Sequence, residues 1–113
     1  MRPGIILLNL GGPQTLRDVK PFLYNLFSDP DILIGIPTPL RQILAFAISR
    51  LKSPRSIRMY QLIGGGSPQL HWTQLQAKAL AEVLKKNGNQ YEVAIGMRAW
   101  EPRICNALEE LHK

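Results

Sequence analysis

The chain has 113 residues, a formal charge of +6, 45% hydrophobic residues and a single cysteine. This length suits one domain or part of one, and the composition is typical of a soluble globular protein. Because Cys105 is the only cysteine, an internal disulfide and a multi-cysteine metal site are excluded, and a reducing, cytosolic setting is favoured.

The first predicted element is a β-strand over residues 4–9, an apolar run typical of a strand buried on both faces of a parallel sheet. The run is too short to span a membrane, and no signal-peptide cleavage pattern follows it. Gly11-Gly12-Pro13 comes next. Ligands of open α/β sheets bind at the carboxyl ends of strands, so we expect a site here. Nucleotide is disfavoured because the G-x-G-x-x-G pattern is missing and Pro13 lacks an N–H.

A helix is predicted from Thr15, with Asp18 completing a capping box, to about Ser28. An irregular apolar stretch then occupies residues 28–37. A second helix is predicted over residues 38–51, and a separate short helix opens at Ser53-Pro54 and ends near Leu62.

The second predicted helix is apolar on more than one side, because Phe46 lies off its main stripe. The extra face is either core or an exposed lip that binds an apolar ligand or rests on a membrane surface. Basic residues also gather here. Three interpretations of these residues are open: a solvated face, a groove for an anionic ligand, or a nucleic-acid surface. The last is the least favoured, because aromatic residues are not interleaved with the charges. These residues are Arg41, Arg50, Lys52, Arg55 and Arg58.

The third part of the chain begins at Gly64-Gly65-Gly66-Ser67, whose N–H groups are a weak candidate for anion binding. A long helix is predicted over residues 69–86. Its predicted inner face consists of Trp72, Leu75, Gln76, Ala79, Leu80 and Val83. A strand over residues 91–97 and a helix over residues 104–111 complete the order. Two parallel strands alone rarely hold a domain together, so we expect these residues to be the first part of a larger sheet.

Candidate catalytic groups are few. His71 and His112 stand alone, and no histidine, cysteine or carboxylate residues have metal-ligand spacing. Arg98 follows the second strand at the edge where α/β sites form, so it is either a site residue or part of a structural salt bridge.

Four segments, in this order, resemble the N-terminal part of the ferrochelatase family. They are Leu7 to Pro13, Phe22 to Asp31, Tyr60 to Pro68, and Gly96-Met97-Arg98. The resemblance implies a three-layer chelatase-like α/β fold with a parallel sheet, of which residues 1–113 are the first, incomplete half-domain. It implies insertion of ferrous iron into a porphyrin such as protoporphyrin IX, which the enzyme bends to expose a pyrrole nitrogen.

The resemblance also implies which residues contact the porphyrin. Leu10 matches an apolar residue against the macrocycle, and Lys52 falls where the family often has an arginine that meets a propionate. Arg98 matches an arginine that lines the active site. The other matching positions are an apolar lip of Leu23, Leu26, Phe27 and Ile32, and polar contacts at Tyr60 and Ser67.

The sequence departs from the family at Ala99, where an aromatic residue is common, and at Glu101, where a basic residue is common. We therefore expect a wider or differently charged pocket there. The family's catalytic histidine and glutamate lie downstream of residue 113, so we expect these residues alone not to insert iron, and assign no resident metal. The question of an iron–sulfur cluster stays open.

The expected partners are porphyrin, ferrous iron and the remainder of a ferrochelatase chain, without nucleic acid. The expected location is cytoplasmic, with residues 28–51 as the segment for peripheral membrane contact. The alternative is a truncated, non-catalytic module that binds porphyrin or haem.

Overall fold

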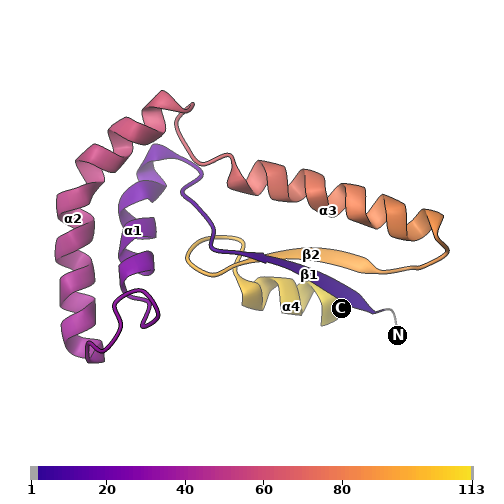
Figure 1. Ribbon diagram of the computed structural model, residues 1–113, viewed down its shortest axis with the longest axis horizontal. Coiled ribbons are helices and arrows are strands. Elements are labelled where there is room, and N and C mark those ends of the chain that lie inside the picture. Colours follow the sequence, from indigo (N-terminus) through magenta and orange to yellow (C-terminus); the bar gives the residue numbers. More distant parts are fainter. Residues whose placement is uncertain (1–2, 113) are drawn as a thin grey trace. The chain divides into compact units, whose positions relative to one another are not determined.

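A computed structural model describes residues 3–112; residues 1, 2 and 113 of the predicted domain lie outside the described part. Its elements form two compact units, shown in Figure 1. The sheet unit comprises residues 3–11 and 68–112, and the helical unit residues 12–67. In chain order, the elements are β1 (Gly4–Asn9), a 3-10 helix (Leu16–Asp18), α1 (Val19–Phe27), α2 (Thr38–Leu62), α3 (Gln69–Lys86), β2 (Glu92–Met97) and α4 (Ile104–His112). The predicted α/β class is confirmed.

The sheet unit is built on β1 and β2, which pair in parallel with Leu8 opposite Gly96. Helices α3 and α4 both pack on β2, from opposite sides of the strand pair in Figure 1. The core contains Met97 and Ala107, each 1% exposed. A Cβ at Gly96 would lie 3.0 Å from the Ile104 Cα, so glycine permits the close approach of α4.

Two packing expectations for the sheet unit are wrong. Leu8 of β1 is 64% exposed, because β2 is the only strand that pairs with β1 within residues 3–112. On α3, Trp72 and Val83 of the predicted inner face are 59% and 54% exposed, whereas Thr73, outside that face, is buried; Leu80, which was predicted for the inner face, is half-buried. Helix α3 therefore carries two stripes, and the one that contains Thr73 is buried.

In the helical unit, α1 packs along α2. The interface is formed by larger apolar residues of α1 against small residues of α2, which let the two backbones approach closely. The buried residues are Val19, Phe22 and Leu23 on α1, and Ala45, Ser49 and Ser53 on α2. Arg41 stabilises the segment that connects α1 to α2. Its Nε donates to the Ser28 carbonyl at 2.7 Å, and its Nη1 donates to the Ile36 carbonyl at 3.1 Å.

The predicted break at Ser53-Pro54 is wrong, because α2 runs without interruption through Pro54. A proline inside a helix removes the N–H that would bond to the carbonyl four residues earlier. In α2 the preceding residue, Ser53, is buried, and its hydroxyl donates to the Ser49 carbonyl. The buried residues of α2, Ala45, Ser49 and Ser53, extend up to the residue before the proline, so packing in this part of the helix outweighs the local signal.

Candidate functional site

The sheet unit has a cavity at the carboxyl ends of its two strands, where the sequence predicts a site. The cavity measures about 350 Å³ and is lined by Leu8, Asn9, Leu10, Arg98 and Ile104. Two of the predicted site residues, Leu10 and Arg98, are thus brought together although they lie far apart in the sequence.

Backbone pairing that continues beyond the strands holds these two residues in place. The Arg98 N–H donates to the Asn9 carbonyl at 3.0 Å, and the Ala99 N–H donates to the Leu10 carbonyl at 2.9 Å. Leu10 is 39% exposed, and Arg98 is exposed as well. An accessible apolar surface therefore lies beside a guanidinium group.

The loop after Arg98 contains the two departures from the family pattern. Ala99 is 4% exposed, so its methyl group belongs to the core of the sheet unit. The Glu101 carboxylate lies 3.5 Å from the Arg103 Nε, and the Arg103 Nη1 lies 3.5 Å from the Arg98 carbonyl oxygen. Arg103 therefore connects Glu101 to the backbone of Arg98. The effect of these departures on a pocket stays a prediction.

Most of the other predicted site residues belong to the α1–α2 pair of the helical unit. The Lys52 Nζ lies 5.4 Å from the centroid of the Phe27 ring, so the structure brings these two together in a cation–π contact. Leu26 is half-buried beside Phe27 on α1, and Leu23 is only 8% exposed within the helix interface. Ile32, in the connection between the helices, is 43% exposed.

Tyr60 and Ser67 flank the glycine run. The Tyr60 carbonyl accepts from the Gly65 N–H at 2.8 Å, and the Ser67 N–H donates to the Pro13 carbonyl at 2.7 Å. A Cβ at Gly66 would collide with the carbonyl of Gln14, so glycine is needed where the two segments approach. Because the N–H groups of Gly65 and Ser67 bond to the chain itself, an anion site on this run is disfavoured.

Other site types find little support in the described residues. Between residues 3 and 112 there is no group of three or more histidine, cysteine, aspartate or glutamate side chains that could hold a metal ion. None of the helices in that range has the length and apolarity needed to cross a membrane.

Sequence reasoning missed three residues that line the cavity of the sheet unit: Leu8, Asn9 and Ile104. The first two end the predicted strand, and the third begins the helix after the second strand. Their positions at element boundaries on the carboxyl side of the sheet were the available signal.

Comparison with known proteins gives a consistent result. The family model described as Ferrochelatase matches residues 2–113. A ferrochelatase from Aquifex aeolicus (strain VF5) is 50% identical over 113 residues, which cover 100% of this chain and 35% of the relative. A ferrochelatase from Gloeobacter violaceus is 51% identical over 109 residues, covering 96% of this chain and 33% of that protein. A ferrochelatase from Gloeothece citriformis is 53% identical over 113 residues, covering 99% and 29%. The chain therefore spans about a third of the length of these relatives.

Proposed function

Because the chain belongs to the ferrochelatase family, we propose that it forms one wall of a porphyrin cleft in an enzyme that inserts Fe²⁺ into a porphyrin to make haem. Iron is a substrate in this reaction. The family match supports the reaction class, and the cavity of the sheet unit is the observation that supports a role in binding the macrocycle.

A porphyrin substrate is a flat apolar ring that carries carboxylate side chains, and the cavity is chemically suited to both parts. Leu8 and Leu10 present apolar surface, whose burial against the ring is favourable. Arg98 presents a guanidinium group, which can bind a carboxylate through two parallel hydrogen bonds. We assign Leu10 to contact with the macrocycle and Arg98 to a carboxylate or the reacting ring, as a supporting residue.

The helical unit supports a second set of contacts. Phe27 offers a flat apolar face, and Lys52 holds a positive charge above it. Lysine meets a propionate as a point charge, without the two-pronged geometry of arginine. Leu26 and Ile32 extend the apolar surface, and Tyr60 and Ser67 are proposed as polar contacts. Leu23, buried in the interface, supports this surface by packing.

These residues are proposed to act by binding energy. Contacts with the remote parts of the macrocycle stabilise a bent ring, in which a pyrrole nitrogen is accessible to the metal. The catalytic histidine and glutamate of the family are proposed to lie outside these 113 residues. The residues described above then bind and orient the porphyrin.

The proposal is tested by replacing Leu10 with aspartate in the protein expressed from its complete gene. A carboxylate against the macrocycle and near the propionates should weaken protoporphyrin binding by about tenfold or more. The matched control is Leu108→Asp, which changes a leucine of α4 that is 57% exposed and does not line the cavity. Porphyrin affinity is measured by Soret titration, and turnover by haem formation from ferrous iron.

Three outcomes decide the proposal. Selective loss of porphyrin binding and haem formation in the Leu10 variant supports it. Equal effects of both substitutions contradict the assigned contact. Porphyrin binding without haem formation in the unsubstituted protein favours the alternative, a non-catalytic porphyrin or haem carrier.

Peripheral membrane contact through residues 28–51 is proposed as well, in a protein of the cytoplasm. Exposed apolar side chains support it, with Ile34 79% and Ile43 66% exposed. The 25 residues of α2 also contain no acidic residue. Cosedimentation with phospholipid vesicles, compared between the protein and an Ile34→Asp variant, tests this contact.

A further inference from the structure

The helical unit has a second concave feature, an open groove between α1 and α2. The groove measures about 310 Å³ and is lined by Lys20, Pro21, Tyr24, Phe46 and Ser49. None of these residues is among the porphyrin contacts proposed above, and only Phe46 and Ser49 lie within the segment 28–51 that is proposed for membrane contact.

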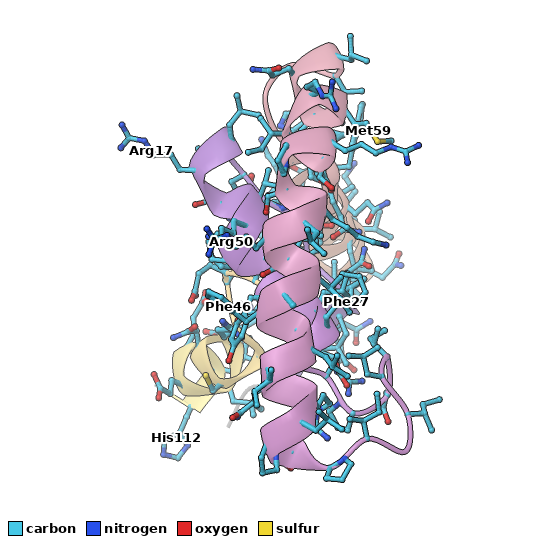
Figure 2. The ribbon with its side chains drawn as sticks, turned by 90° about the vertical axis from the view of Figure 1, so that its left-hand side faces the viewer. Arg17, Phe27, Phe46, Arg50, Met59 and His112 are labelled. Carbon is cyan, nitrogen blue, oxygen red and sulfur yellow. The ribbon has the colours of Figure 1, made fainter. Side chains whose placement is uncertain are left out.

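The groove and the Phe27–Lys52 contact lie on different sides of the helix pair. On α2, the stripe of small residues that includes Ser49 faces α1. With 3.6 residues per turn, Phe46 is placed on one flank of this stripe and Lys52 on the other. Figure 2 agrees, since Phe46 and Arg50 lie along one edge of α2 and Phe27 along the opposite edge.

The groove has an apolar floor that remains open. The Phe46 side chain is 53% exposed, and Pro21 beside it is also exposed. Tyr24 contributes a second aromatic ring to the lining. Such a surface favours the apolar part of a ligand, because its burial removes carbon from water.

The charge at the rim is positive. The Lys20 Nζ lies 5.7 Å from the centroid of the Phe46 ring. Neither α1 nor α2 contains an acidic residue, and Arg50 lies on the same edge of α2 as Phe46 in Figure 2. Within residues 3–112, Lys20 forms its aromatic contact with Phe46 and no ion pair. The ammonium group is therefore placed to receive an anion.

We infer that this groove binds one molecule of an anionic amphiphile of the fatty-acid type. Its carboxylate lies beside Lys20, and its apolar arm lies against Pro21, Tyr24 and Phe46. The volume is near the lower end of the range of about 300–1,000 Å³ for small-molecule sites, so it suits a single short tail. The positive charge of Lys20 favours an acid, and the small apolar surface favours a short alkyl chain.

The test uses the protein expressed from its complete gene and decanoate, below its micelle concentration, as the probe. Binding is measured by calorimetry. Lys20→Glu and Phe46→Gln should each lower decanoate affinity by about tenfold, the former by charge reversal and the latter by loss of apolar contact. The matched controls are Lys78→Glu on α3 and Leu51→Gln on α2, both at exposed positions away from the groove. The controls should retain decanoate affinity, and thermal unfolding should show that all four variants are folded.

Three results would overturn the inference. One is decanoate affinity that is the same in the Lys20 and Phe46 variants as in their controls. Another is equally strong binding of 1-decanol, which would show that the positive charge selects nothing. The last is no binding of monomeric decanoate together with Lys20-dependent binding to phosphatidylglycerol vesicles, which would make this face a membrane surface.

Discussion

Replacing Arg98 with alanine is expected to weaken porphyrin binding much more than it destabilises the fold. The backbone of Arg98 is held by its N–H bond to the Asn9 carbonyl and by the contact of its own carbonyl with Arg103, and neither depends on the Arg98 side chain. The side chain is exposed. Interactions of exposed charges contribute about 0–1 kcal/mol, so the free energy of unfolding should fall by less than about 1 kcal/mol.

The expected loss in binding is larger. A hydrogen bond to a charged group contributes about 1.5–3 kcal/mol, which corresponds to a change of about 10- to 150-fold in the dissociation constant. Arg98→Lys keeps the charge and loses the planar fork, so its affinity should lie between those of the protein and the alanine variant. Lys78→Ala removes an exposed charge from α3, outside the cavity, and is the matched control.

The assay compares two quantities for each variant, both in the protein expressed from its complete gene. Urea denaturation gives the free energy of unfolding, and Soret titration with protoporphyrin gives the dissociation constant. If Arg98→Ala lowers stability by as much as it lowers the binding free energy, then Arg98 belongs to a structural salt bridge. If porphyrin affinity is unchanged in Arg98→Ala, the assignment of the cavity to porphyrin is wrong.

Two further substitutions test the packing of the helical unit. Gly66→Ala should lower the free energy of unfolding by about 1–3 kcal/mol or more, because the added methyl collides with the Gln14 carbonyl; thermal unfolding that matches the unsubstituted protein would show that the two segments are not in close approach. Pro54→Ala should raise the stability, by at most about 3 kcal/mol, because it restores the N–H that can bond to the Arg50 carbonyl in the interior of α2; a lower melting temperature would show that α2 depends on its proline.

The part of the candidate site that lies at the strand ends could be predicted from the sequence. An apolar run followed by Gly11-Gly12-Pro13 predicts a strand and a site behind it, and the cavity with Leu10 and Arg98 lies there. Ile104 was missed, because its place in the cavity depends on how α4, which begins at this residue, packs against β2. From the sequence, an exposed surface around Phe46 was only one of the interpretations of the extra apolar face of the second predicted helix. The position of α1 against α2 decides which flank of that helix stays open.

The sequence by itself determined the type of most secondary-structure elements and their order along the chain. The strands, the long helix over residues 69–86 and the final helix follow from apolar periodicity and from glycine and proline at the ends, which act over a few residues. Tertiary structure alone decided three other features: the continuation of α2 through Pro54, the choice of the Thr73 stripe for burial, and the pairing of Phe27 with Lys52. The physical reason is that a periodic pattern shows which faces of a helix are apolar, whereas burial of a face depends on which distant segment packs against it.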